Sequence, residues 1–223
     1  MLFIGKGRVR MMRQYNQATN IGYKGKTVAT EQAWSHKSYE LPLQELRRLA
    51  PDLEWKYLPV ISPAYSPVEI CQMIGEWYRA CSSETRRHNA GQFFTAPPVA
   101  HYMARIIGKL ENGMHILDPG AGVGMLASAI CEAALQQKLS TISITAYESD
   151  PALHLLCSWA LTYISDILHN NGINIFIEVH QRDFLEAMAE RIQQTSLWSQ
   201  GTQPEHLFDI AILNPPYFKV NQK

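Results

Sequence analysis

The sequence has no apolar run long enough to cross a membrane. Of its 223 residues, 46% are hydrophobic and 18% are charged, but each uninterrupted apolar stretch is far shorter than the roughly 18 residues that a spanning helix needs. The N-terminus also lacks the apolar centre of a signal peptide. We therefore expect a cytoplasmic protein without membrane contact, built from one domain of about 150 residues and an appendage.

Cysteine is scarce, and its spacing excludes two common uses of this residue. No C-x-x-C pair is present, and the four cysteines are scattered along the chain at Cys71, Cys81, Cys131 and Cys157. Zinc sites and disulfide frameworks are recognised by regular cysteine spacing. The sequence therefore predicts free thiols in a reducing compartment and no structural metal.

Net charge is zero overall, but the charges are unevenly divided. Residues 1–87 hold 13 basic and 8 acidic residues, whereas residues 88–223 hold 7 and 12, so the two parts carry +5 and −5. Six basic residues precede the first acidic one, Glu31. A polyanion such as nucleic acid would be attracted to this end. The alternative is that these residues form only a solvated, disordered arm.

Two helices are predicted in the first part of the chain. Leucines recur at helical spacing over residues 43–49 and stop at the helix breaker Pro51. Further on, Ser66 and Pro67 form an N-cap and N1 pair that opens a second helix, which we expect to continue through Ala80.

A domain boundary is predicted directly after these helices. Residues 82–87 are polar and contain no apolar side chain, which is typical of a linker. They divide a basic, partly helical segment, residues 1–87, from a second unit, residues 88–223. Residues 1 to about 38 show no periodicity and are predicted to be mostly irregular.

The second unit alternates between helices and short apolar runs. An apolar stripe formed by Val99, Tyr102, Met103, Ile106, Ile107 and Leu110 predicts its first helix. Strands are predicted over residues 114–117, 142–147, 173–179 and 208–213, with helices over 125–137, 152–169 and 185–193 between them. Such alternation is typical of an α/β fold with a parallel sheet, whose ligands bind beyond the carboxyl ends of the strands. The fourth strand is predicted to be an unprotected edge.

A glycine-rich loop follows the first of these strands and leads into a helix. Gly120, Gly122 and Gly124 allow the backbone to approach a ligand closely. The third glycine comes one residue earlier than in the dinucleotide fingerprint G-x-G-x-x-G, and Asp118 precedes the first. Because a carboxylate favours a cation over a pyrophosphate, we expect the ammonium of an amino acid moiety near Asp118.

Acidic residues also follow the second and third strands. Glu148 can accept hydrogen bonds from both hydroxyls of a ribose, with Asp150 as the alternative. After the third strand, Asp183 can accept from an adenine amino group and Phe184 can stack on the base. Each acid alone would be an ordinary loop carboxylate, but their shared position at strand ends indicates one site.

A short segment before the striped helix is a further candidate. Thr95 is predicted to cap that helix, where exposed N–H groups can hold a carboxylate. Phe93 and Phe94 either line an apolar cofactor wall or belong to the hydrophobic core.

The tetrapeptide Asn214-Pro215-Pro216-Tyr217 directly follows the fourth strand. The amide oxygen of Asn214 and the carbonyl of Pro215 can each accept one hydrogen from an exocyclic NH2 group. The two prolines stiffen the backbone, and Tyr217 offers a face on which a flipped base can stack. Alone, the tetrapeptide is equally compatible with a plain turn.

Taken together, these segments resemble the gamma-class N6-adenine DNA methyltransferases, in the order cofactor segment, glycine loop and Asn-Pro-Pro-Tyr. The resemblance runs from about Gly91 to Lys219, with one departure at Ala96, where the family usually has proline. It implies a Rossmann-like fold that depends on S-adenosylmethionine. By position, it assigns the methionine end of this cofactor to Phe93, Phe94 and Thr95.

The resemblance also implies the remaining roles. Asp118 to Gly124 matches the cofactor loop, Glu148 matches the ribose acid, Asp183 and Phe184 match the adenine contacts, and Asn214 to Tyr217 is the catalytic motif. It implies an enzyme that flips an adenine out of double-stranded DNA and methylates N6, with a specificity or restriction subunit as a possible partner. Because six residues follow the motif, we expect a chain truncated there, with a sheet incomplete at its C-terminal strands.

Three alternatives remain open. RNA methyltransferases and protein-glutamine methyltransferases also use Asn-Pro-Pro-Tyr on an NH2 group, although the segment at residues 91–95, placed before the glycine loop, disfavours them. A nicotinamide-dependent dehydrogenase is the second. The third is a noncatalytic subunit of a restriction-modification assembly that keeps a pocket for S-adenosylmethionine or DNA.

Overall fold

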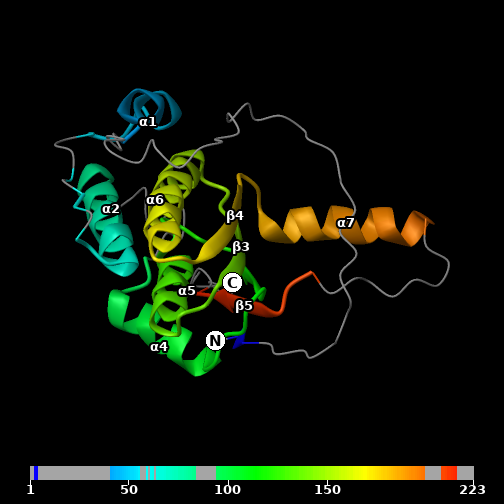
Figure 1. Ribbon diagram of the computed structural model, residues 1–223. Helices are drawn as coiled ribbons and strands as arrows, with labels where there is room; N and C mark the ends of the chain where they lie inside the picture. The colour runs from blue at the N-terminus through cyan, green and yellow to red at the C-terminus, as the bar shows by residue number, and fades with distance from the viewer. Residues whose placement is uncertain are drawn as a thin grey trace, which may run out of the picture.

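A five-stranded sheet forms the centre of the described part of the molecule (Figure 1). The computed structural model describes residues 3–4, 41–55, 59, 61–62, 64–83, 94–198 and 207–214. The strands are β1 (Phe3–Ile4), β2 (His115–Asp118), β3 (Thr141–Tyr147), β4 (Asn174–His180) and β5 (Ile210–Leu213). Their spatial order is β1-β5-β2-β3-β4, and β2 to β5 run parallel. The predicted α/β architecture and all four predicted strands are confirmed within two residues.

The fourth parallel strand, β5, is not the edge of the sheet as predicted. β1 pairs with it in the antiparallel direction, with Phe3 opposite Leu213 and Ile4 opposite Ile212. Residues 3–4 thus form a strand that the sequence did not predict, while the other N-terminal residues lie outside the described part, so that their mostly irregular structure stays a prediction. A strand of two residues is too short to be recognised from periodicity in the sequence. It forms because its residues pair with β5.

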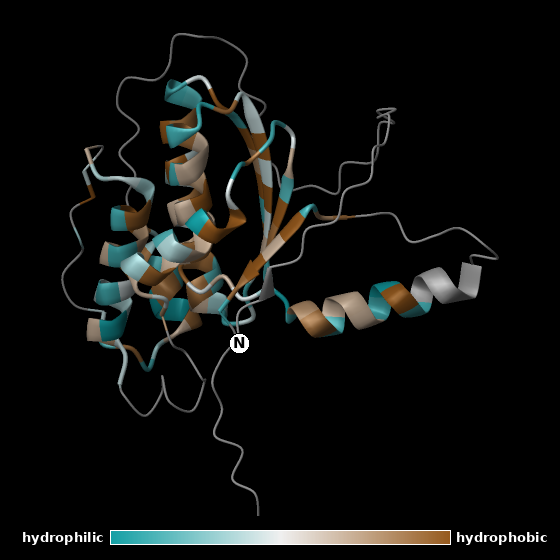
Figure 2. Cartoon of the chain, turned by 90° about the horizontal axis from the view of Figure 1, so that it is seen from below, coloured by the Kyte–Doolittle hydropathy of each residue, from teal (hydrophilic) through white to brown (hydrophobic). Residues whose placement is uncertain are grey.

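Five of the six described helices lie on one side of the sheet (Figure 1). These are α1 (Leu43–Leu49), α2 (Pro67–Cys81), α4 (Pro97–Ile107), α5 (Met125–Gln136) and α6 (Pro151–Asn170). The sixth, α7 (Phe184–Trp198), stands clear on the other side, as Figure 2 shows from below. Accordingly, the side chains of Leu185 and Ile192 on α7 are 74% and 68% exposed.

The hydrophobic core lies between the sheet and the five helices. Alternate residues of β3 face it, so Ile142, Ile144 and Ala146 are buried in it. Residues between them face away, and there the Oγ1 of Thr145 lies 2.7 Å from Nε2 of His115 on the neighbouring strand β2. Residues of α1 and α2 share this core with α5 and α6. The division of the chain near residue 87 stays a prediction.

The predicted opening of α2 is confirmed by a capping box. The Ser66 hydroxyl accepts from the Glu69 N–H at 3.3 Å, and the Glu69 carboxylate accepts from the Ser66 N–H at 2.7 Å. Pro67 occupies the first helical position, where its missing N–H costs nothing. Trp77 and Tyr78 are adjacent on this helix, and both are buried, so the face of α2 that packs into the core is wide.

Two predictions about α4 are wrong. Its N-cap is Ala96, without a side-chain cap, rather than Thr95. The predicted apolar stripe also splits, because Met103 is buried while Tyr102 and Ile106 are 61% and 43% exposed. Apolar periodicity identified the helix but could not show which of two adjacent apolar faces meets the core.

The four cysteines are free thiols, as predicted, and all four are buried. Burial raises the pKa of the Cys71 thiol to about 12, so this thiol stays protonated and unreactive. Within the described residues, no helix combines the length and apolar character that crossing a membrane would require.

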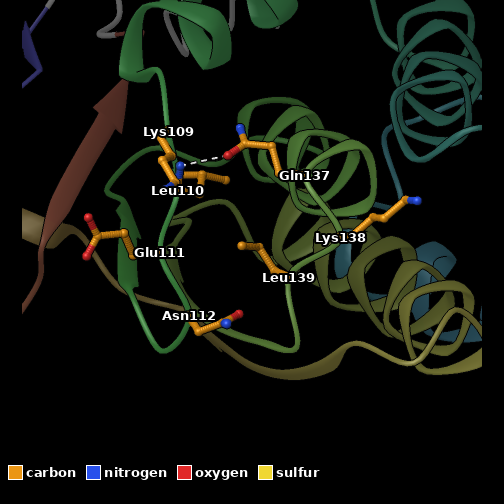
Figure 3. Close-up of a pocket in the computed structure, with 7 residues that line it drawn as sticks. All are labelled: Lys109, Leu110, Glu111, Asn112, Gln137, Lys138 and Leu139. Carbon is orange, nitrogen blue, oxygen red and sulfur yellow. Dashed lines mark hydrogen bonds between the residues drawn. The ribbon is translucent and has the colours of Figure 1, made fainter.

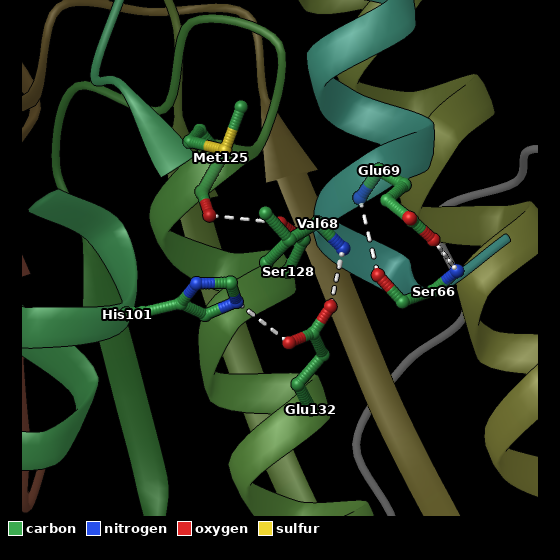
Figure 4. A network of polar contacts seen from close by, with 7 residues as sticks. All are labelled: Ser66, Val68, Glu69, His101, Met125, Ser128 and Glu132. Carbon is green, nitrogen blue, oxygen red and sulfur yellow. Dashed lines mark hydrogen bonds and ion pairs between the residues drawn. The ribbon is translucent and has the colours of Figure 1, made fainter. Parts of the chain in front are cut away.

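Glu132 on α5 joins three helices through its two carboxylate oxygens (Figure 4). One oxygen accepts from the backbone N–H of Val68, in the first turn of α2, at 2.9 Å. The other lies 2.7 Å from Nε2 of His101 on α4. A carboxylate at the start of a helix satisfies an N–H that has no partner within the helix and also complements the helix dipole.

Replacing Glu132 with alanine should therefore destabilise the fold more than an ordinary surface substitution. Loss of the acceptor leaves the N–H of the buried residue Val68 without this partner, so we expect the free energy of unfolding to fall by about 1–3 kcal/mol. Urea unfolding followed by circular dichroism measures this change. The control is Glu111→Ala at an exposed position; equal effects of the two substitutions would contradict the proposed link.

Candidate functional site

Polar residues from three strands meet at the carboxyl edge of the sheet. Asp118 ends β2, Glu148 directly follows β3, and Asn214 directly follows β5. Because β2 pairs in parallel with both β3 and β5, the ends of these strands lie side by side. This is the position at which open parallel sheets bind their ligands.

The glycine loop has a backbone that only glycine adopts easily. Gly122 and Gly124 have φ angles of +57° and +89°. A Cβ added to Gly124 would also lie 3.3 Å from the side chain of Leu161, so this residue packs tightly against α6. At Gly120, by contrast, an added Cβ would meet no atom within 4 Å. The loop therefore packs tightly against α6 at Gly124 and faces open space at Gly120.

Glu148 holds this loop against the end of β3. One of its oxygens accepts from the N–H of Gly122 and the other from the N–H of Asp150, both at 2.8 Å. Burial raises the pKa of Glu148, while these N–H groups act in the opposite direction. Each carboxylate oxygen can accept a second hydrogen bond, so the same residue can also receive ribose hydroxyls.

Asp150, the alternative ribose acid, already has a structural role. Its carboxylate caps α6 by accepting from the N–H groups of Ala152 and Leu153 at 2.9 and 3.0 Å. The contact between Glu148 and the glycine loop therefore favours Glu148 as the ligand-facing acid.

Asp118 is fully buried beneath the glycine loop. Neither carboxylate oxygen has a hydrogen-bond partner within the described residues. Burial is the main cause that raises the pKa of Asp118 to about 7, and the nearby charge of Glu148 adds to it. The N–H groups of Gly120 and Ala127 oppose this rise electrostatically without reaching hydrogen-bond geometry.

Phe94 forms an apolar wall between α2 and the glycine loop. Its ring makes an edge contact with Tyr78 at a centroid distance of 5.7 Å. A Cβ placed on Gly122 would lie 3.9 Å from the same ring, as would one on Gly75 of α2. The half-buried Phe94 therefore belongs both to the core and to the border of the loop.

The next residue, Thr95, reaches the end of β5. Its hydroxyl oxygen accepts a hydrogen bond of 3.0 Å from Nδ2 of Asn214, across 119 residues of sequence. Both side chains are half-buried. The segment before α4 and the start of the predicted catalytic motif are therefore in direct contact.

The predicted adenine contacts lie further along the same edge. The exposed Asp183 caps α7 by accepting from the N–H of Glu186 at 3.1 Å. Phe184 meets Tyr147 edge-on at a centroid distance of 5.3 Å. Tyr147, which also packs against His180, was not among the predicted site residues. In the sequence, this aromatic residue could have been noticed because it directly precedes Glu148.

Four predicted site residues, Phe93, Pro215, Pro216 and Tyr217, lie outside the described residues. A recess at the opposite, amino end of β2 and β3 involves none of the predicted site residues (Figure 3). There Gln137 accepts from the N–H of Leu110 at 2.9 Å and joins two loops. The recess is lined by Lys109, Leu110, Glu111, Asn112, Gln137, Lys138 and Leu139.

The fold and the site define a Rossmann-like α/β protein with a glycine loop after its first parallel strand. Residues 72–223 match the family described as N-6 DNA Methylase. This match spans more than half of the chain, and the chain therefore belongs to that family.

Two curated relatives agree with this assignment. The chain is 30% identical over 144 residues to the type II methyltransferase M.PstI of Providencia stuartii, covering 63% of this chain and 26% of that protein. It is 32% identical over 132 residues to M.BsuBI of Bacillus subtilis, covering 58% and 25%. The chain thus spans about a quarter of the length of these relatives.

Among solved structures, the chain is similar to a modification subunit of a putative type I restriction enzyme from Vibrio vulnificus YJ016. It is 20% identical, has a TM-score of 0.37, and is matched over 54% of this chain and 25% of its own.

The two ends of the glycine loop should respond differently to alanine. Gly124→Ala forces a side chain into a left-handed backbone conformation against Leu161, so we expect a loss of about 1–3 kcal/mol in the free energy of unfolding. Gly120→Ala meets open space and should change it by less than about 0.5 kcal/mol. Chemical denaturation measures both, and equal effects would contradict the described loop geometry.

Asp118 should make stability depend on pH. Its pKa is about 7 in the folded protein and near 3.8 when unfolded, so the protonated form favours folding. This contribution is complete below about pH 4 and is lost as the pH rises to about 7, by at most about 1.4 kcal/mol per pH unit. Asp118→Asn should remove this slope. Unfolding of both proteins between pH 4.5 and 8 measures it; parallel pH profiles would show that Asp118 does not titrate in this range.

Proposed function

We propose that this chain carries the catalytic segment of an S-adenosylmethionine-dependent DNA methyltransferase that modifies N6 of adenine. The observation that carries the proposal is the meeting, at one sheet edge, of the open glycine loop and the side chain of Asn214. Family membership supports the reaction class. The family description, N-6 DNA Methylase, supports DNA as the substrate, and the type II methyltransferases among the relatives support methyl transfer.

The described residues fit this cofactor. The space beside Gly120 accommodates a ligand against the backbone, where a side chain would stand in any other residue. The buried carboxylate of Asp118, which has no hydrogen-bond partner within the described residues, complements a cationic ligand when it is ionised, and Glu148 can receive ribose hydroxyls. Phe94 supplies an apolar wall. When bound, S-adenosylmethionine supplies a methyl group on a positively charged sulfur.

Asp183 and Phe184 are assigned to the adenine ring of the cofactor. Asp183 is exposed and already caps α7, but a carboxylate can accept several hydrogen bonds. The edge contact between Phe184 and Tyr147 keeps the Phe184 ring in a defined place at the end of β4. Phe93, which precedes Phe94 in the sequence, is assigned to the methionine end.

Asn214 is the residue that acts on the substrate. Its amide oxygen accepts a hydrogen from the exocyclic NH2 of an adenine turned out of the duplex, and the carbonyl of Pro215 accepts the other. These bonds orient the nitrogen lone pair toward the methyl carbon, so that an N–C bond would form as the sulfur–methyl bond breaks. The nitrogen becomes cationic and then loses one proton, so alignment and local electrostatics suffice without a charged base. Pro216 stiffens the turn, and Tyr217 stacks on the extruded base.

The partners follow from the same reaction. Double-stranded DNA is the substrate, and the basic residues near the N-terminus of the sequence carry a positive charge that attracts its phosphates. A specificity or restriction subunit is proposed as a further partner, on the resemblance of the sequence to restriction-modification methyltransferases.

Methyl transfer and cofactor binding test the proposal separately. The unaltered chain should transfer tritium from methyl-labelled S-adenosylmethionine to unmethylated DNA and produce N6-methyladenine, detected by chromatography of the hydrolysed DNA. Asn214→Ala should lower transfer at least about a hundredfold, because it removes the acceptor for the amine. Its Kd for S-adenosylmethionine should stay within about twofold of the unaltered protein.

Gly120→Ala is the control for the cofactor site, because it should fold normally yet fill the open space. S-adenosylmethionine should raise the melting temperature of the unaltered chain but not of this variant, and NAD should raise neither. Cofactor binding without any transfer would favour a noncatalytic subunit instead. Stabilisation by NAD alone would favour a dehydrogenase.

A further inference from the structure

Thr95 lies where two parts of the site meet. Its hydroxyl oxygen accepts the 3.0 Å hydrogen bond from Nδ2 of Asn214. It does not serve as the N-cap of α4, since Ala96 occupies that position without a side-chain cap. The contact links segments that come together only through tertiary folding.

A hydrogen bond to Nδ2 decides which end of the Asn214 amide faces the ligand. The side-chain amide carries a donor NH2 at one end and an acceptor oxygen at the other, and rotation about its last bond is only weakly restricted. When Thr95 receives the NH2, the oxygen points away from Thr95. If the amide turned over, the Thr95 hydroxyl would donate to the oxygen that the reaction requires as an acceptor.

The residue beside Thr95 is fixed to the cofactor side of the site. The ring of Phe94 packs against Tyr78 at 5.7 Å and lies beside Gly122 of the glycine loop. Residues 94 and 95 therefore span from the glycine loop to Asn214. A short, anchored connection of this kind holds its hydroxyl in place without the entropic cost of ordering a mobile side chain.

We propose that Thr95 is a positioning residue that orients the Asn214 amide, with its oxygen toward the target amine, rather than a ligand of the cofactor carboxylate. This inference rests on the proposed methyltransferase function and adds a residue to it. Thr95 touches neither reacting atom and acts only through Asn214. Its loss should therefore slow the chemical step without weakening cofactor binding.

Thr95→Val and Thr95→Ser separate the hydroxyl from the shape of the side chain. Valine keeps the volume but cannot accept a hydrogen bond, so kcat for transfer to DNA should fall about tenfold to a hundredfold. Serine keeps the hydroxyl and should restore kcat to within about threefold of the unaltered protein. For both variants, the Kd for S-adenosylmethionine from calorimetric titration should stay within about twofold.

A second measurement reads the hydrogen bond without catalysis. The side-chain NH2 signals of Asn214, assigned by their loss in Asn214→Asp, should shift in nitrogen–proton correlation spectra of Thr95→Val and stay nearly unchanged in Thr95→Ser. Thr162→Val is the matched control, because it removes a threonine hydroxyl bonded to Ser158 on the surface of α6. It should leave both kcat and the Asn214 signals unchanged. If Thr95→Val does not fold, Thr95→Ala replaces it in both measurements.

The outcomes distinguish this inference from the proposed function. If Thr95→Val binds S-adenosylmethionine much more weakly but keeps its kcat, Thr95 is a cofactor ligand and the inference fails. If serine restores nothing, the hydroxyl is not the cause and the inference also fails. Normal transfer by the variant overturns the inference alone, whereas no transfer by the unaltered chain overturns the proposed function and this inference with it.

Discussion

The parallel pairing of β2 with both β3 and β5 is the constraint on which the site depends. It places Asp118 opposite Ala146 and aligns Leu117 with Ala211, so the loops after all three strands leave the sheet at one edge. A shift of one residue would turn Ile116 out of the core and exchange the two faces of β2. The buried residues that stabilise the sheet therefore also fix the separation of the glycine loop and Asn214.

The glycine loop combines two features: a left-handed backbone conformation and a buried carboxylate beneath it. Gly124 takes a left-handed backbone conformation against α6, and Asp118 is buried without a hydrogen-bond partner within the described residues. A buried carboxylate in this state opposes folding, which is why its pKa rises. Glu148 holds the loop against the end of β3 by accepting a hydrogen bond from the Gly122 N–H. A ligand cation beside Asp118 would compensate the charge of this buried carboxylate.

The elements with strong local signals were predictable from the sequence. Ser66 and Pro67 define the start of α2 because capping and proline geometry act within one turn. Alternating helices and apolar runs define the parallel sheet for the same local reason. The predictions failed where distant residues decide. β1 forms only because β5 offers its edge, and the exposed face of α4 is as apolar by pattern as the buried one.

By itself, the sequence determined the fold class and which residue types stand at the strand ends, including Asp118, Glu148 and Asn214. These follow from periodicity and local turn chemistry, which need no distant partner. Only the tertiary structure decided what each side chain contacts: Glu148 binds the glycine loop, Asp150 caps α6, and Thr95 meets Asn214. A hydrogen bond across 119 residues depends on strand order and register, and no local pattern in the chain encodes it.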